Sequence, residues 1–203
     1  MRNDPRMFCV AAAAMAVAAC APQTVREESA GQVARTSTEG LLNAWPEKSR
    51  EAATAIIAAY GEPDERTATM LVWHDKGPWK HTIAYRDPVP HSFPMPHVDV
   101  VEQFIDYRVP PDKFDDLAIY DGSVIAERTK GVMSARCDKE AMNFLALNLA
   151  NDIATGKTTA EDARKEYAKQ AMAFMNKQPA PYTEGLKFTV PRGGTADPDT
   201  PAM

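Results

Sequence analysis

The chain has 203 residues and a formal net charge of −5 at pH 7. This length accommodates one domain with flanking tails, and the acidic balance argues against a nucleic-acid-binding protein, which needs a basic face. Without residues 1–19, the chain keeps 21 basic and 27 acidic residues, a net charge of −6. The same balance argues against electrostatic attraction to anionic lipid.

The first twenty residues have the pattern of a secretory signal. Arg2 and Arg6 precede an apolar run from Met7 to Ala19, which is followed at once by Cys20. The run is shorter than the roughly 20 residues that a membrane-spanning helix needs. A basic start, a short apolar segment and small residues before a cleavage point predict a signal peptide over residues 1–19.

The letters VAAC that end at Cys20 resemble the bacterial lipobox. This resemblance implies diacylglycerol on the Cys20 sulfur, cleavage before Cys20 and acylation of the new amino terminus. Ala21 stands where an aspartate would retain a lipoprotein in the inner membrane, so the resemblance implies the outer membrane, facing the periplasm. Several acyl chains would anchor the protein stably, since a single chain binds only marginally.

The chain after the signal peptide divides into three parts. Residues 20–40 are predicted to be the lipidated cysteine and a flexible, polar tether. Residues 41–178 carry the periodic apolar patterns and are predicted to form one domain. Residues 179–203 contain five prolines and three glycines, which predicts a disordered tail.

Three helices are expected in the domain. The first spans about 46–60 on an apolar stripe at helical spacing, with Gly61 and Pro63 ending it. The second begins at Asp138 and runs to about Thr155. The third follows Thr158-x-x-Glu161, the spacing of a capping box.

Strands are expected between the first two helices. Residues 67–73 and 79–85 flank a five-residue loop and predict a hairpin. The proline-dense residues 87–97 predict a stiff, extended loop. Further segments are a strand favoured over a helix at 98–109, a helical turn at 112–116, and short strands at 117–120, 123–128 and 132–136. This order predicts an α+β fold with an N-terminal helix, a mostly antiparallel sheet and two C-terminal helices.

A candidate metal site lies in and beside the proline-dense loop. His97 and Asp99 are two residues apart, so on an extended chain both side chains point the same way, and His91 lies across the loop. Imidazole and carboxylate donors suit zinc or another divalent transition metal. In the alternative interpretation His91 and His97 bond to loop carbonyls, and Asp99 caps a backbone turn.

Aromatic residues offer a second candidate site. Trp73, Trp79, Tyr85 and Phe93 could line a groove for a small apolar ligand, although aromatic residues on strands more often belong to the core. Cys137 would be the one cysteine of the mature chain that carries no lipid. We expect it to be buried and inert.

These patterns predict a lipid-anchored cell-envelope protein, a non-enzymatic binding or structural module with another envelope protein as its partner. The helix ending in Tyr-Gly-x-Pro and the Trp-bearing hairpin, residues 46–85, are loosely similar to small outer-membrane assembly lipoproteins. The alternative is a metal-binding protein or metal-dependent enzyme that uses His91, His97 and Asp99. Histidine ligands must be neutral, so metal binding should weaken below about pH 6.

Overall fold

A computed structural model describes residues 37–203. The signal peptide, Cys20 and most of the tether lie outside these residues. The described helices are α1 (Thr38–Leu42), α2 (Glu47–Tyr60), α3 (Phe114–Tyr120), α4 (Glu140–Ala154) and α5 (Ala160–Met175), with 3-10 turns η2 (Pro111–Lys113) and η3 (Pro181–Thr183). The strands are β1 (Glu65–Arg66), β2 (Met70–His74), β3 (His81–His91), β4 (His97–Asp106), β5 (Val124–Glu127) and β6 (Val132–Cys137).

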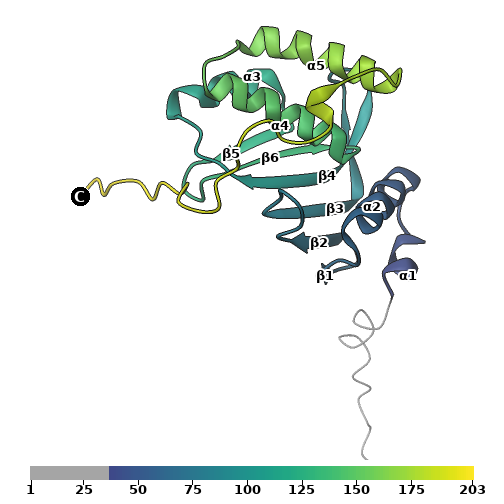
Figure 1. Cartoon of the computed structure of the whole chain (residues 1–203). Coiled ribbons are helices and arrows are strands. Elements are labelled where there is room, and N and C mark those ends of the chain that lie inside the picture. Colours follow the sequence, from purple (N-terminus) through teal and green to yellow (C-terminus); the bar gives the residue numbers. More distant parts are fainter. Residues whose placement is uncertain (1–36) are drawn as a thin grey trace, which may run out of the picture.

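The six strands form one antiparallel sheet in the order β1-β2-β3-β4-β6-β5. Helices α3, α4 and α5 gather at the β4-β6-β5 part of the sheet, and α2 packs against β3 and β4 (Figure 1). The expected α+β fold with a mostly antiparallel sheet is confirmed. The segment 98–109, ambiguous in sequence, is mainly the strand β4, as favoured.

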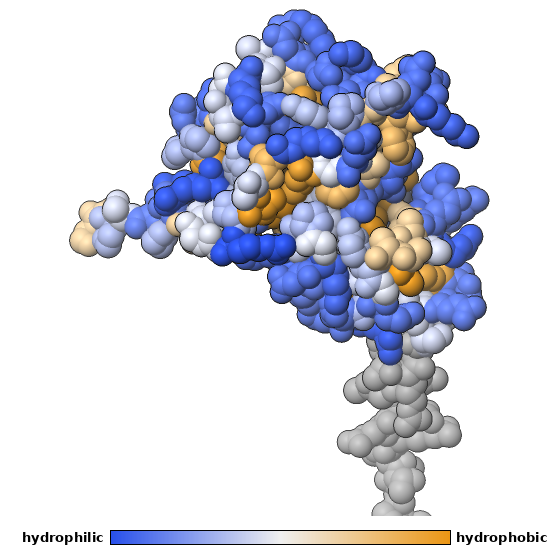
Figure 2. Space-filling view, in the orientation of Figure 1, coloured by the Kyte–Doolittle hydropathy of each residue, from blue (hydrophilic) through white to orange (hydrophobic). Residues whose placement is uncertain are grey.

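The core lies between one face of the sheet and the helices. Along β4, the side chains of Val101, Gln103 and Ile105 share the face toward the helices and are fully buried, and their neighbours Val100 and Glu102 are buried as well. On the opposite face Ile83 and Phe104 stay partly exposed. Hydrophilic residues cover most of the surface seen in Figure 2, and hydrophobic residues gather in a few patches between them. Within residues 37–203, no helix has both the length and the apolar character needed to cross a bilayer.

A buried polar cluster fixes the start of α4 against the sheet. The Oε1 atom of Glu140 accepts hydrogen bonds from Tyr60 Oη at 2.7 Å, Trp79 Nε1 at 2.6 Å and Gln103 Nε2 at 2.9 Å. These donors come from α2, the β2–β3 loop and β4. The carboxylate also lies in the first turn of α4, where the helix dipole favours a negative charge. The cluster therefore positions the turn between β6 and α4.

Some element predictions were wrong in detail. Residues 117–120, expected to form a strand, are helical, because Leu117 and Tyr120 lie three residues apart and both turn into the core from α3. Thr159, one residue later than expected, caps α5 by accepting a hydrogen bond from the Asp162 N–H. At α4 the N-cap position is Lys139, not Asp138. These errors concern short segments and helix ends, where neighbouring residues compete for the same role.

Residues 182–188, at the start of the expected disordered tail over 179–203, instead pack on the domain. Asn148 of α4 donates a hydrogen bond to the carbonyl oxygen of Tyr182 at 3.0 Å, and its own Oδ1 accepts the Lys187 N–H at 2.7 Å. Phe188 packs on the core beside α4. Because a buried amide satisfies the backbone and apolar side chains anchor it, the compact unit continues beyond residue 178.

Candidate metal site

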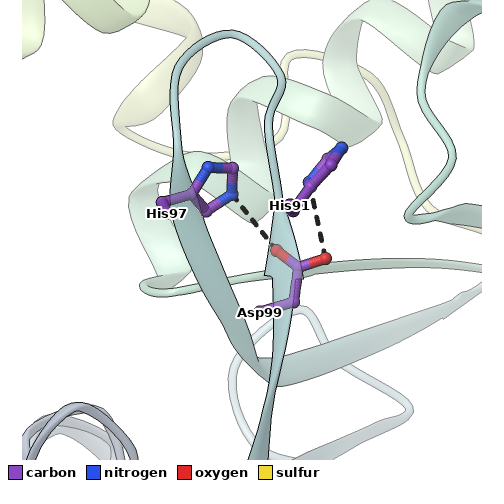
Figure 3. A group of neighbouring side chains, drawn as sticks. All are labelled: His91, His97 and Asp99. Atoms are coloured by element: carbon purple, nitrogen blue, oxygen red, sulfur yellow. Dashed lines mark ion pairs between the residues drawn. The ribbon is translucent and has the colours of Figure 1, made fainter.

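The β3–β4 hairpin brings the three predicted ligands together. Strand β3 continues through residues 87–91 of the expected loop, and β4 begins at His97, so that only residues 92–96 form the turn. His91 and His97 are direct cross-strand partners, and Asp99 follows two residues along β4. Facing partners and alternate residues share one side of a hairpin. Figure 3 shows both imidazole rings beside the carboxylate between them.

The distances within this group are short. His97 Nε2 lies 3.2 Å from Asp99 Oδ1, and His91 Nδ1 lies 3.4 Å from Asp99 Oδ2. One donor atom from each residue lies within 4.8 Å of the other two, so the group could hold a metal ion. In a zinc tetrahedron with bonds of 2.0–2.1 Å, neighbouring nitrogen and oxygen ligands are separated by about 3.3 Å. The two separations are close to this value, and each joins an imidazole to a different oxygen of Asp99.

Both imidazoles meet an acceptor on their far side. His97 Nδ1 lies 2.8 Å from the carbonyl oxygen of Met95, which requires the proton of a neutral ring to be on Nδ1. The far nitrogen of His91, Nε2, faces the Asp121 carboxylate at 3.6 Å. A carbonyl or carboxylate behind the ring is the usual support of a metal-binding histidine, because it fixes the tautomer and the ring orientation. In His91 this leaves the nitrogen nearer Asp99 without a hydrogen bond, whereas in His97 that nitrogen lies 3.4 Å from Cys137 Sγ.

Unpartnered polar atoms gather at the same place. His91 Nδ1, Asp99 Oδ1 and Arg136 Nε are buried and have no hydrogen-bond partner among the described residues. Asp99 is only 2% exposed. A buried polar atom without a partner costs about 1–3 kcal/mol. Since one of these atoms is a carboxylate oxygen and another an imidazole nitrogen, the donors fit a bound cation.

The electrostatics of the group favour a positive charge on His97. Interaction with Asp99, and then with Cys137, raises the pKa of His97 to about 11. Burial raises the pKa of the nearby Asp121 carboxyl. The positive charge means that His97 Nε2 carries a proton. A metal ion on this nitrogen would replace the proton, so metal binding should strengthen as the pH rises.

Sequence reasoning did not place Cys137 or Asp121 at this site. Cys137 is buried, as expected, but its Sγ lies 3.4 Å from His97 Nε2. Burial raises the pKa of its thiol. Asp121 lies between α3 and β5. The sequence spacing of these two residues from the histidines matches no pattern that would predict the contacts, because the contacts arise from the order of strands in the sheet.

The aromatic residues do not form the expected groove. Trp73 and Trp79 are fully buried and belong to two different core clusters. The Tyr85 hydroxyl donates a hydrogen bond to Glu102 Oε2 at 2.8 Å. The Phe93 ring packs on the helices at the hairpin turn, 5.0 Å from the ring of Tyr167. The four side chains serve separate packing contacts.

Comparisons of this chain with protein-family models, with curated proteins and with solved structures found no match. The chemistry of the site therefore rests on its own residues.

Proposed function

We propose that this protein is a lipid-anchored cell-envelope protein whose domain binds a divalent transition metal ion, with zinc as the best fit, through His91, His97 and Asp99. One observation carries the metal proposal. Two imidazole nitrogens and an oxygen of a buried carboxylate lie within 4.8 Å of one another, while the opposite nitrogens face acceptors. The alternative, in which these side chains only satisfy the loop, leaves His91 Nδ1 without a hydrogen bond and Asp99 Oδ1 with only the ion pair to His97 Nε2 at 3.2 Å.

The donor types favour zinc over the harder cations. Magnesium and calcium prefer sets of oxygen ligands, whereas imidazole suits zinc, copper, iron and nickel. The ligands lie on a paired hairpin, which holds them close together before the ion arrives. Three protein ligands would leave one position of a tetrahedral zinc ion for a fourth ligand.

The anchor rests on the signal pattern of residues 1–19 and on Cys20. Lipid on this cysteine would hold the domain at the envelope membrane, on the periplasmic face of the outer membrane. A second candidate function is a binding module for another envelope protein. It is favoured by the sheet face on which Ile125 of β5 is half exposed and Ile83 and Phe104 are partly exposed. Failure to retain any partner after mild cross-linking in membranes would contradict this second candidate.

The metal proposal is tested by zinc titration of residues 21–203, purified without a histidine tag and freed of metal with a chelator. We expect binding of about one zinc ion. A His91→Ala/His97→Ala double variant should lose this binding. The matched control, His74→Ala/His81→Ala, removes the cross-strand pair formed by the last residue of β2 and the first residue of β3, and should bind as the unmodified chain does. Unchanged binding by the first variant would refute the proposal.

A further inference from the structure

Cys137 is placed to reach the same ion. It is the last residue of β6 and pairs with Val101, which shares a face of β4 with Asp99. Its Sγ lies 3.4 Å from His97 Nε2. With zinc–sulfur and zinc–nitrogen bonds of 2.3 and 2.0–2.1 Å, the two ligand atoms in a tetrahedral site are about 3.6 Å apart. The thiol thus lies near ligand spacing from His97.

Charge balance favours a second anion in this site. Asp99 and Cys137 are both almost fully buried. A divalent ion with one carboxylate would leave a net positive charge in a medium that solvates charge poorly. The positive charge of the Arg136 guanidinium, 3.8 Å from Asp99, is balanced by the carboxylate of Asp121 beside His91. A thiolate from Cys137 would bring the ion and its ligands to neutrality.

A small pocket lies on the sulfur side of the site. Its volume is about 80 Å³, and its lining includes His97, Cys137, Met95, Met142 and Phe174. The wall is mainly apolar, while Asp138 and Lys139 pair with each other at 2.7 Å. An apolar shell limits the access of water to a metal–sulfur bond and controls its local dielectric. This apolar surrounding therefore suits a thiolate as the fourth ligand better than a water molecule.

One movement is required. Cys137 Sγ does not belong to the group of donor atoms that lie within 4.8 Å of one another. Rotation about its Cα–Cβ bond is the simplest change that would carry the sulfur toward the ion.

Building on the metal-binding function proposed above, we propose that Cys137 is the fourth ligand and that the complete centre contains one thiolate, two imidazoles and one carboxylate. On binding, the Cys137 S–H bond breaks, its proton leaves to solvent, and a sulfur–metal bond forms. A thiolate makes the centre selective for zinc and other thiophilic ions over magnesium, calcium and manganese.

The test uses the full chain, purified in detergent and loaded with Co²⁺ in place of zinc. We expect the near-ultraviolet absorption of a sulfur-to-cobalt charge transfer and intense visible bands of a tetrahedral ion. In the Cys137→Ser variant the sulfur band should vanish, and the affinity should fall by at least about tenfold. With residues 1–19 removed and Cys20 lipidated, Cys137 is the one cysteine left with a free thiol and is the source of the sulfur signal. Circular dichroism and a thermal melt establish that the variant is folded.

The outcomes separate this inference from the function on which it rests. If the unmodified chain binds no cobalt or zinc, the metal-binding function is wrong and this inference falls with it. If the unmodified chain binds cobalt without a sulfur band, or if Cys137→Ser binds equally well, only the thiolate ligand is wrong. Alkylation of Cys137 by iodoacetamide at equal rates with and without zinc would also overturn ligation and indicate a free thiol beside His97.

Discussion

Replacing Glu140 by alanine should destabilise the domain strongly, because one oxygen atom of this side chain accepts three hydrogen bonds. The donors are Tyr60, Trp79 and Gln103 at 2.6–2.9 Å. Trp79 and Gln103 are fully buried, so water cannot replace the lost acceptor. Gln103 Nε2 keeps a second contact with the Thr82 hydroxyl at 3.3 Å, whereas Trp79 Nε1 is left without a partner.

The expected magnitude follows from these differences. Bonds to a charged acceptor are worth about 1.5–3 kcal/mol, and an orphaned buried donor costs about 1–3 kcal/mol. We assign about 2–3 kcal/mol to Trp79, about 1 kcal/mol to Gln103 and less than about 1 kcal/mol to the half-buried Tyr60, or about 4 kcal/mol in all. The Glu140→Gln variant keeps an oxygen acceptor but loses its charge, so its loss should be about half as large.

Urea unfolding followed by tryptophan fluorescence measures both losses. The control is Glu51→Ala, which removes an exposed partner of Lys48 on α2 and should change the stability by less than about 0.5 kcal/mol. The reasoning would be refuted if the alanine and glutamine variants of Glu140 were equally stable, or if both lost less than about 1 kcal/mol.

Three further predictions concern the hairpin, its histidine and the C-terminal segment. The raised pKa of His97 stabilises the metal-free fold fully below about pH 6.5, and this contribution is lost as the pH rises toward about 11. Urea midpoints should therefore show the unmodified chain losing stability relative to His97→Ala between pH 7 and pH 10, and a pH-independent difference would contradict this. Gly131→Ala places a Cβ 2.2 Å from the Thr195 carbonyl carbon at φ +65°, whereas Gly156→Ala meets no atom within 4 Å at φ +74°. Both changes strain the backbone by about 1–2 kcal/mol, so thermal melts should show a clearly larger loss at Gly131, and equal losses would be evidence against docking of the segment around Thr195. Phe93→Ala removes a ring that packs on α5 under a guanidinium at 3.8 Å and should destabilise the domain by about 2 kcal/mol; zinc calorimetry should also show weaker binding, and an unchanged affinity would show that the ligands do not depend on this anchor.

Local patterns predicted much of the fold because they depend on neighbouring residues. The stripe of α2 and its stop at Gly61, where φ is +83°, are set within a few residues. The alternation of side chains also predicted which face of β4 packs against the helices. The order of the C-terminal segment was missed, because composition does not reveal that Asn148 of α4 satisfies the backbone at Tyr182 and Lys187. That contact joins residues more than thirty positions apart.

In the candidate site, too, local contacts could be predicted from the sequence and long-range contacts could not. His97 and Asp99 were predictable as a pair, because alternation on a strand places them on one side. His91 depended on the hairpin register, in which the proline-dense residues extend β3 instead of forming a long loop. Cys137 and Asp121 reach the site through the pairing of β6 with β4 and through the end of α3. Sequence spacing does not encode these long-range placements.

Elemental analysis of the zinc-loaded full chain, after gel filtration to remove free ions, shows whether His91 and His97 hold a metal ion. We expect about one zinc ion per chain, with the metal lost in the His91→Ala/His97→Ala variant and retained in the His74→Ala/His81→Ala control. A folded chain that carries no metal, or a His91→Ala/His97→Ala variant that keeps it, would mean that these two histidines do not bind a metal ion.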